Sequence, residues 1–259
     1  MNTEELKDIA ENLINAFKQA GEESIEIEKQ GVQIKTKEDG SPVTNGDLKV
    51  DKIITDQVIK LTPNIPIISE ETVDLKKKNK LETYWLIDPI DGTKEYIAGR
   101  EEYTLNAGLI YQKKPVLGVI GVPKKNQIFY SYGKGFSFLL ENDKVQKIDC
   151  KKRSPKGEVL ALTNHNNPPE IILKKLKEFG ATSFRKLSSS YKYCLIANGD
   201  YDLYLDKVRA KEWDDAAGQA IAEGAGAIVT DLDNEFFEYG KEDYKNPTIL
   251  IKRNMNLND

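Results

Sequence analysis

An apolar run that ends in two closely spaced carboxylates is the segment of this chain best suited to chemistry. Residues 85–93 read Trp-Leu-Ile-Asp-Pro-Ile-Asp-Gly-Thr, so Asp88 ends the run and Asp91 follows in a turn. Divalent cations such as Mg²⁺ prefer oxygen ligands, usually a few carboxylates completed by phosphate and water. Gly92 would let the backbone approach closely, so that its amide and that of Thr93 could bind a phosphate oxygen. The same residues also fit a strand followed by an Asp-rich turn.

Three other segments place acidic residues where they could join this pair. Glu70 and Glu71 directly follow the apolar run 65–68, and Asp214 opens a helix of small residues. Asp47 leads into another helix. For both aspartates a simple helix cap is an open alternative, because helix N-termini favour acidic residues. Their joint occurrence favours a shared cation site.

The overall charge limits the partners. The chain has 259 residues and a formal net charge of −4, with 39% hydrophobic and 31% charged residues. This composition is typical of a globular protein of one large domain or two modest ones. Without a global basic field we expect no nucleic acid polymer as partner. An anionic small molecule remains a suitable substrate if bound cations stand between it and the carboxylates.

Targeting signals are not visible. The N-terminus is acidic, no apolar run approaches the roughly 20 residues of a membrane helix, and Cys150 and Cys194 do not suggest a disulfide framework. We expect a cytoplasmic protein without a transmembrane segment, with peripheral association with the inner membrane as an open alternative. The sequence leaves monomer and homodimer equally open.

The first half of the chain predicts consecutive strands between helices. Helical spacing over 3–20, with Asn2 and Glu5 as a capping pair, predicts a first helix that stops at Gly21. Alternation at 25–27 and 32–34 then suggests a hairpin. The elements expected after it are a helix over 47–61 and strands over 65–68, 84–88, 103–111, 116–122 and 128–132.

The second half alternates strands with helices, which is typical of an α/β layer. The expected strands are 159–163, 201–205 and 227–230, and the expected helices are 170–179, 189–197 and 214–223. The polar stretch 141–157 is either the passage between two halves or a surface hairpin. We therefore predict an N-terminal α+β metal-binding half over 1–145 and a C-terminal α/β substrate-binding half over 146–259.

The acidic segments, taken in order, resemble the inositol monophosphatase-like superfamily of metal-dependent, lithium-sensitive phosphatases. The matching segments are Pro-Val-Thr with Asp47, Ser-Glu-Glu at 69–71, Asp-Pro-Ile-Asp-Gly-Thr at 88–93, and Trp-Asp-x-Ala-Ala-Gly at 213–218. The resemblance spans nearly the whole chain. It implies a combined α/β and α+β fold, a layered αβαβα sandwich of the inositol monophosphatase/fructose-1,6-bisphosphatase type.

Two further segments resemble the bisphosphate nucleotidases of that superfamily: Lys-Glu-Tyr at 94–96 and Ser-Ser-Tyr-Lys-Tyr-Cys at 189–194. Those enzymes use Mg²⁺ and water to remove the 3′-phosphate of adenosine 3′,5′-bisphosphate, a by-product of sulfate activation, and its phosphosulfate analogue is a further candidate. The alternatives are an inositol or sugar monophosphatase of the same superfamily and a catalytically silent metal- or nucleotide-binding protein.

The resemblance also implies a ligand set for two or three Mg²⁺ ions. Glu70, Asp88 and the carbonyl of Ile90 would hold one ion. Asp88, Asp91 and Asp214 would hold a second, and Glu70 would reach a weaker third through water. Two ions roughly 3.5–4 Å apart can activate a water and stabilise the leaving oxygen of a phosphate ester.

The remaining implied roles concern water and substrate. Asp47 and Thr93 would hydrogen-bond to each other and orient the attacking water, while the amides of Gly92 and Thr93 bind the scissile phosphate. The implied contacts to the rest of the substrate come from Lys192, Ser189, Ser190, Asp214 and the only histidine, His165.

Four positions depart from the nucleotidase pattern, all except the first on the substrate side. Gly46 replaces an alanine, Ser188 replaces a glycine, and residues 162–164 replace a serine-rich approach to His165. Asp206 stands where an arginine is usual, with Lys207 and Arg209 as candidates to replace it. Reaction type is therefore predicted more firmly than substrate.

Overall fold

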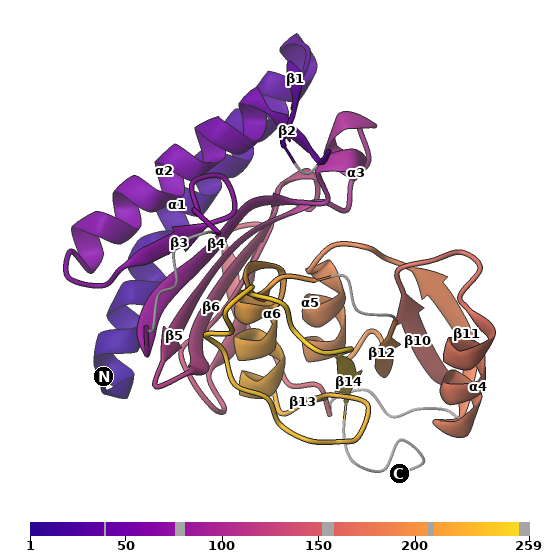
Figure 1. The fold of residues 1–259 in the computed structure, drawn as a ribbon. Helices are drawn as coiled ribbons and strands as arrows, with labels where there is room; N and C mark the ends of the chain where they lie inside the picture. The colour runs from indigo at the N-terminus through magenta and orange to yellow at the C-terminus, as the bar shows by residue number, and fades with distance from the viewer. Residues whose placement is uncertain (39, 76–80, 152–157, 207–209, 254–259) are drawn as a thin grey trace.

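The computed structural model describes residues 1–38, 40–75, 81–151, 158–206 and 210–253. Its elements stack in five layers, with helices outside and between two sheets (Figure 1). This arrangement confirms the layered αβαβα sandwich. No helix in these ranges is long and apolar enough to cross a membrane.

The larger sheet has seven strands in the order β3-β4-β5-β6-β7-β8-β9. Only β3 and β4 run parallel to each other; the other neighbours are antiparallel. The bounds are β3 (Ile67–Ser69), β4 (Thr83–Asp91), β5 (Thr104–Tyr111), β6 (Lys114–Val122), β7 (Gln127–Ser131), β8 (Ser137–Glu141) and β9 (Lys144–Lys147), with a 3₁₀ turn η1 (Pro123–Lys125) between β6 and β7.

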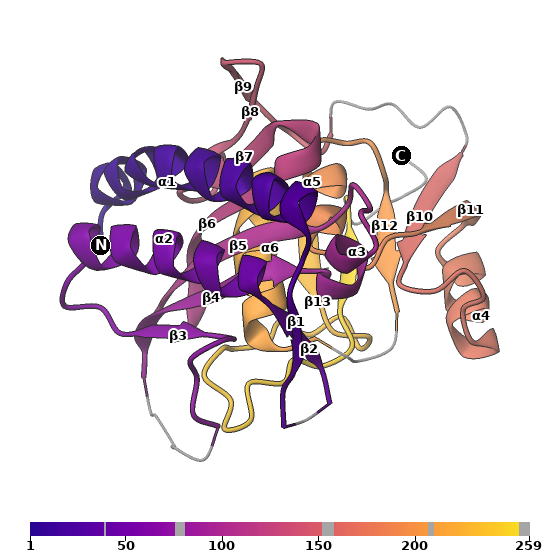
Figure 2. The same cartoon turned by 90° about the horizontal axis from the view of Figure 1, so that it is seen from above.

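Two long helices cover the outer face of this sheet, α1 (Thr3–Gln30) and α2 (Asn45–Leu61). They lie side by side across the strands (Figure 2) and share one apolar core with them, which includes Phe17, Val50 and Trp85. The capping pair predicted at the start of α1 is confirmed, since Asn2 and Glu5 exchange side chain-to-amide hydrogen bonds of 2.9 Å.

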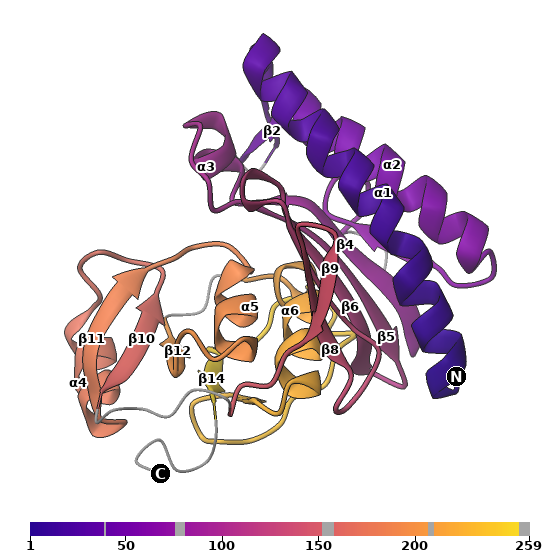
Figure 3. The same cartoon turned by 180° about the vertical axis from the view of Figure 1, so that it is seen from behind.

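The smaller sheet has five strands in the order β11-β10-β12-β14-β13. Helices α5 (Tyr191–Ala197) and α6 (Glu212–Gly224) lie between the two sheets, and α4 (Glu170–Glu178) packs near β10 and β11 at the far side (Figure 3). The strands are β10 (Val159–Thr163), β11 (Ala181–Lys186), β12 (Leu203–Leu205), β13 (Ile228–Thr230) and β14 (Leu250–Lys252).

The fit of α6 against the large sheet requires a glycine. A Cβ placed on Gly118 of β6 would lie 2.2 Å from the carbonyl oxygen of Ala217. Since no larger residue fits there, backbone and helix meet directly. The first turn of α6, which carries Asp214, is therefore held close to the strands.

The start of the chain differs from the sequence prediction. Helix α1 does not stop at Gly21 but continues to Gln30, and the hairpin expected from 25–27 and 32–34 is instead β1 (Ile34–Thr36) paired with β2 (Pro42–Thr44). Gly21 is tolerated because it lies against Pro123, whose Cβ is 3.5 Å from the position of an added Cβ. A tertiary contact thus overrides a local stop signal.

The middle of the chain resolves one alternative. Strands β8 and β9 form a hairpin, so hairpin is the right interpretation for the beginning of 141–157, while 152–157 lie outside the described residues. The chain leaves the large sheet after Lys147, and the predicted division at 145/146 would cut β9. The division into two halves stays a prediction. The elements not foreseen are β8, β9, β11, β14 and the short helix α3 (Thr93–Ile97).

Candidate active site

Three carboxylates from three elements converge at the end of the large sheet. Glu70 follows β3, Asp88 lies in β4, and Asp214 stands in the first turn of α6. One ligand oxygen from each lies within 4.8 Å of the others. The parallel pairing of β3 with β4 places Glu70 beside the end of β4, and α6 packs across the neighbouring strands.

Asp91 is held toward this cluster by the start of α5. Its Oδ2 accepts from the Ser190 amide at 2.5 Å and from the Ser190 hydroxyl at 2.6 Å. The same hydroxyl also contacts the backbone carbonyl of Asp214. Ser190 therefore ties two predicted metal ligands together. Burial raises the pKa of Asp91, opposed by the positive charge of Lys192 and these hydrogen bonds.

The electrostatics of the cluster fit a divalent cation. Burial first, then the charges of the neighbouring carboxylates, raise the pKa of Asp88 and of Asp214 well above the usual range. Asp88 Oδ1 is buried and has no hydrogen-bond partner in the described part of the chain. A buried, unpaired carboxylate oxygen is costly, and an oxygen-only donor set is the kind that Mg²⁺ takes. The residues present therefore fit the ion implied by the sequence.

A lysine that the sequence analysis missed contacts the same cluster. Lys37, between β1 and β2, has its ammonium 2.9 Å from Glu70 Oε1 and 2.9 Å from Glu71 Oε1. Burial works against its charged form, but the two carboxylates raise the pKa of Lys37 overall. Burial likewise raises the pKa of Glu71 to about 7, with Lys37 opposing the shift. Lys37 thus balances part of the negative charge.

The residues expected to orient water are arranged differently from the prediction. Buried Asp47 accepts from the amide of Thr44 at 2.8 Å and from its hydroxyl at 2.5 Å, which caps α2. Thr93 donates its hydroxyl to the carbonyl of Ile90 at 3.2 Å. The expected Asp47–Thr93 hydrogen bond is not formed in this arrangement of the described residues and stays a prediction, and the Ile90 carbonyl already has a donor. Burial raises the pKa of Asp47, while the Thr44 contacts oppose the shift.

The structure explains why glycine stands at two positions beside these residues. Gly92 has φ of 93°, a left-handed conformation, and precedes the first turn of α3. Gly46, which replaces the usual alanine, faces the ring of Tyr96: an added Cβ would lie 2.6 Å from the tyrosine hydroxyl oxygen. The tyrosine therefore occupies the space of the missing methyl group.

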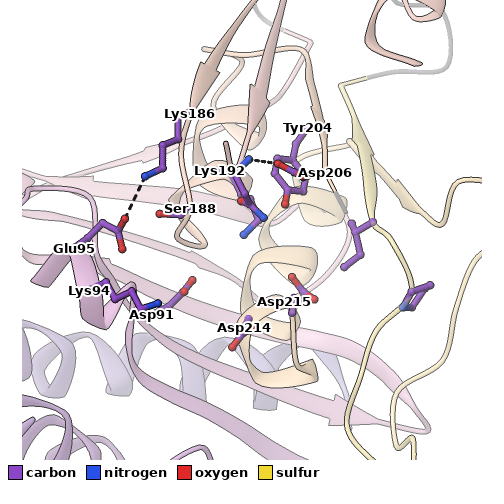
Figure 4. Close-up of a pocket in the computed structure, with 14 residues that line it drawn as sticks. Asp91, Lys94, Glu95, Lys186, Ser188, Lys192, Tyr204, Asp206, Asp214 and Asp215 are labelled. Atoms are coloured by element: carbon purple, nitrogen blue, oxygen red, sulfur yellow. Dashed lines mark hydrogen bonds and ion pairs between the residues drawn. The ribbon is translucent and has the colours of Figure 1, made fainter. Parts of the chain in front are cut away.

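A cavity of about 360 Å³ opens over Asp91 and Asp214 (Figure 4). It lies between α3, the end of β11, the start of α5, β12 and α6. Its lining residues are Asp91, Lys94, Glu95, Asn164, Lys186, Ser188, Lys192, Tyr204, Asp206, Ala210, Asp214, Asp215, Pro247 and Ile249. A small polar ligand bound here would lie directly beside the carboxylates.

The predicted serine contacts are corrected by this geometry. Ser189 and Ser190 are fully buried and neither lines the cavity, whereas Ser188 does. The hydroxyl of Ser189 donates to the carbonyl of Glu102, and that of Ser190 holds Asp91. The Ser190 hydroxyl therefore supports the metal-binding side, and neither hydroxyl lines the cavity.

Lys192 lines the cavity, but its ammonium already contacts a backbone carbonyl and two aromatic rings. Only 4% of the residue is exposed, and its ammonium donates to the Ser189 carbonyl at 3.3 Å. The same group lies 5.4 Å and 5.2 Å from the ring centroids of Tyr193 and Tyr204. Such cation–π contacts stabilise a desolvated ammonium. Its charge also favours ionisation of Asp91.

His165 and Asp206 form a pair beside the cavity. His165 Nδ1 lies 2.9 Å from Asp206 Oδ2, which also accepts from the amide of Asn164 at 2.5 Å. Asp206 thus fixes the loop after β10, and a carboxylate replaces the usual arginine at the cavity wall. The proposed substitutes, Lys207 and Arg209, lie outside the described residues.

Asp215 is another cavity residue that the sequence analysis did not single out. Its two oxygens accept from Tyr193 and Asn246, each at 2.9 Å. Burial raises the pKa of Asp215, with Lys192 opposing the shift. Its position directly after Asp214 was the available signal. Lys186 and Lys37 offered none, because each is one lysine among many.

Comparison with known proteins shows which family the chain resembles. The model of the inositol monophosphatase family matches residues 2–258. The 3′(2′),5′-bisphosphate nucleotidase CysQ of Escherichia coli K12 is 35% identical over 222 residues, 85% of this chain and 89% of the relative. The crystal structure of CysQ from Bacteroides thetaiotaomicron matches with a TM-score of 0.74 and 28% identity, covering 97% of this chain and 96% of that one.

A third relative was crystallised with the expected ligands. An IMPase/NADP phosphatase complexed with Mg²⁺ and phosphate matches with a TM-score of 0.79 and 19% identity, covering 96% of this chain and 91% of that one, which shows the shared fold. With the family model matched across nearly the entire length and a relative above 30% identity, the chain belongs to the inositol monophosphatase family.

Proposed function

We propose that this protein is a Mg²⁺-dependent 3′(2′),5′-bisphosphate nucleotidase that removes the 3′-phosphate of adenosine 3′,5′-bisphosphate, or of its phosphosulfate analogue. The observation that carries the proposal is the convergence of one buried and two half-buried carboxylates beside a polar cavity. The names of the curated relatives support the substrate, because relatives at 30–36% identity are bisphosphate nucleotidases.

The proposed metal ligands follow the converging side chains. Glu70, Asp88 and the Ile90 carbonyl would hold one Mg²⁺, and Asp88, Asp91 and Asp214 a second. A third would bind near Glu70. When bound, the ions would lower the pKa of a water and stabilise the developing charge on phosphate. The Glu70 side requires Lys37 to move or share the carboxylate, because its ammonium is 2.9 Å from Glu70.

The chain's own groups would then position water and phosphate. Rotation of the Thr93 side chain away from the Ile90 carbonyl would free both the hydroxyl and that carbonyl. Asp47 would accept from the reoriented hydroxyl or from the water, since in the described part of the chain the neighbouring residue that donates to its buried carboxylate is Thr44. The amides of Gly92 and Thr93 would bind the scissile phosphate.

Turnover of two substrates tests the proposal. We expect the purified protein with Mg²⁺ to hydrolyse adenosine 3′,5′-bisphosphate with a far larger kcat/KM than inositol 1-phosphate, and Li⁺ to inhibit it. A wide preference for inositol phosphate would replace the nucleotidase with the inositol monophosphatase alternative. If Asp91→Asn left phosphate release unchanged, the metal assignment would be wrong.

Several expectations remain predictions. They are a cytoplasmic location, the absence of a nucleic acid polymer as partner, the number of ions, and a monomeric or homodimeric state. The described residues give no support for peripheral association with the inner membrane.

A further inference from the structure

A nucleoside bisphosphate brings two phosphates to a cavity whose wall already contains carboxylates. Only the phosphate to be hydrolysed can lie at the cluster of Asp88, Asp91 and Asp214. The second phosphate needs a positive group elsewhere in the cavity, because an anion buried beside carboxylates without a partner is strongly disfavoured. The second phosphate therefore requires a cationic side chain of this cavity.

Three lysines line the cavity within the described residues: Lys94, Lys186 and Lys192. Lys192 is the most buried, and its ammonium is engaged by the Ser189 carbonyl and by two aromatic rings. Lys94 directly follows Thr93, whose amide is expected at the scissile phosphate. Lys186 ends β11, an element that carries neither a proposed metal ligand nor this turn.

Among the described residues, Lys186 has no ion-pair contact shorter than 3.6 Å. It ends β11, and its ammonium lies 3.6 Å from Glu95 Oε1, with 32% of the side chain exposed. That distance is longer than a charge-assisted hydrogen bond of about 2.7–2.9 Å. Glu95 is shared with Arg100, whose Nη1 is also 3.6 Å away. In Figure 4 Lys186 and Glu95 face each other at one side of the cavity.

Within the described residues, the opposite wall carries an acidic group. There Asp206, whose side chain is fully buried, points its carboxylate at His165 and the Asn164 amide. A phosphate placed against Asp206 would meet like charge, which costs free energy in a partly desolvated site. The charge distribution of the cavity therefore directs a second anion toward Lys186.

We propose that Lys186 is a specificity-determining residue whose ammonium binds the phosphate that is not hydrolysed. This inference rests on the proposed nucleotidase function and adds to it an anion subsite at the end of β11. Binding replaces the long contact to Glu95 with a charge-assisted hydrogen bond to phosphate, while Glu95 keeps Arg100 as its partner. The subsite raises kcat/KM for substrates with two phosphates above that for substrates with one.

Two nucleotides that share the scissile phosphate isolate this contact. The test compares kcat/KM for adenosine 3′,5′-bisphosphate and for adenosine 3′-monophosphate, in the wild type and in Lys186→Gln, with Mg²⁺ present. We expect the variant to lose roughly tenfold on the bisphosphate, the size of a hydrogen bond to a charged group. Its loss on the monophosphate should be several times smaller, and Lys186→Arg should recover most of the bisphosphate activity.

A matched control changes a lysine on the helix that packs beside β11. Lys177 is exposed on α4 and does not line the cavity, so Lys177→Gln should leave both activities at the wild-type value. Thermal unfolding of all variants checks the fold, which partly exposed Lys186 is not expected to affect.

The outcomes separate the subsite from the function. Equal losses on both nucleotides, or no loss on either, would overturn the role of Lys186 while leaving the nucleotidase intact. A wild type that hydrolyses neither nucleotide but acts on inositol 1-phosphate would overturn the proposed function, and the subsite with it. A selective loss on the bisphosphate that arginine repairs supports both.

Discussion

The two sides of the cavity are built in opposite ways. The metal-binding floor takes its carboxylates from β3, β4 and α6, and buried donors such as Ser190 fix their directions. The substrate wall uses residues at strand ends and loops, among them Lys186 and the Asp206–His165 pair. Packing and several buried hydrogen bonds position the carboxylates of the floor, whereas a few polar contacts hold the side chains of the wall. Reaction type is therefore fixed by the fold, and substrate choice by replaceable side chains.

The largest effect should come from the floor. Asp88→Asn removes the charge that both proposed ions share, and we expect kcat/KM to fall by roughly a thousandfold or more, because metal ions contribute several kcal/mol to the transition state. Steady-state phosphate release measures it. Asp56→Asn, a change on the exposed face of α2, is the control and should keep full activity. A loss below tenfold would argue against a shared ligand at Asp88.

A neighbouring pair of serines gives a smaller, sharper contrast. Ser190→Ala removes the hydroxyl that orients Asp91, and loss of such a supporting contact typically costs about 10- to 100-fold in metal affinity or activity. The activation midpoint for Mg²⁺ should rise accordingly. Ser189→Ala, whose hydroxyl contacts only the Glu102 carbonyl and a nearby amide, should leave that midpoint nearly unchanged. Equal midpoints in the two variants would mean that Ser190 does not position a ligand.

Protons should compete with metal at the floor. The raised pKa values of Asp88 and Asp214 mean that the metal-free protein holds protons there that the unfolded chain has released. The stability of the metal-free protein therefore falls as the pH rises through the range in which the folded protein loses these protons. Binding of Mg²⁺ expels the protons, so affinity should increase from pH 6 to pH 8. Thermal unfolding at several pH values, without and with Mg²⁺, measures the stability of the metal-free protein and its gain on binding Mg²⁺. A gain that shrinks with rising pH would contradict the expected competition between protons and Mg²⁺.

The smallest effect is expected at the wall. Asp206→Asn keeps an acceptor for the Asn164 amide but removes the charge facing His165, so we expect a twofold to fivefold change in KM for the nucleotide, in line with the roughly 0–1 kcal/mol of a partly exposed pair. The Mg²⁺ midpoint should not move. A shift in that midpoint as large as that of Ser190→Ala would erase the contrast between wall and floor.

The floor could be predicted because its signals are local. Asp88 and Glu70 stand at strand ends and Asp214 at a helix start, and strand and helix patterns place such residues in space. The layered fold followed from the resemblance of the same segments. By contrast, the end of α1 depended on the packing of Gly21 against Pro123, which no periodicity reveals.

The roles of individual polar side chains were harder to predict. Ser189 and Ser190 have the chemistry of substrate ligands, yet both are buried. The Ser190 hydroxyl contacts Asn106 of β5 and the Asp214 carbonyl of α6, and the Ser189 hydroxyl donates to the Glu102 carbonyl. The Asp47–Thr93 contact is not formed in this arrangement, since each side chain has a nearer backbone or side-chain partner. Lys37 and Lys186 pair with carboxylates that are distant in sequence, and sequence spacing carries no information about such pairs.

The contact between Gly118 and Ala217 has a consequence for how the protein can be divided. The helix that fits this glycine belongs to the C-terminal half, yet it fills the inner face of the N-terminal sheet and carries Asp214. A fragment ending at Lys147 would expose that glycine-lined face to water and lack one carboxylate. The two halves are therefore not interchangeable modules: a chimera that joins halves of two relatives would have to inherit strand and helix as one matched unit.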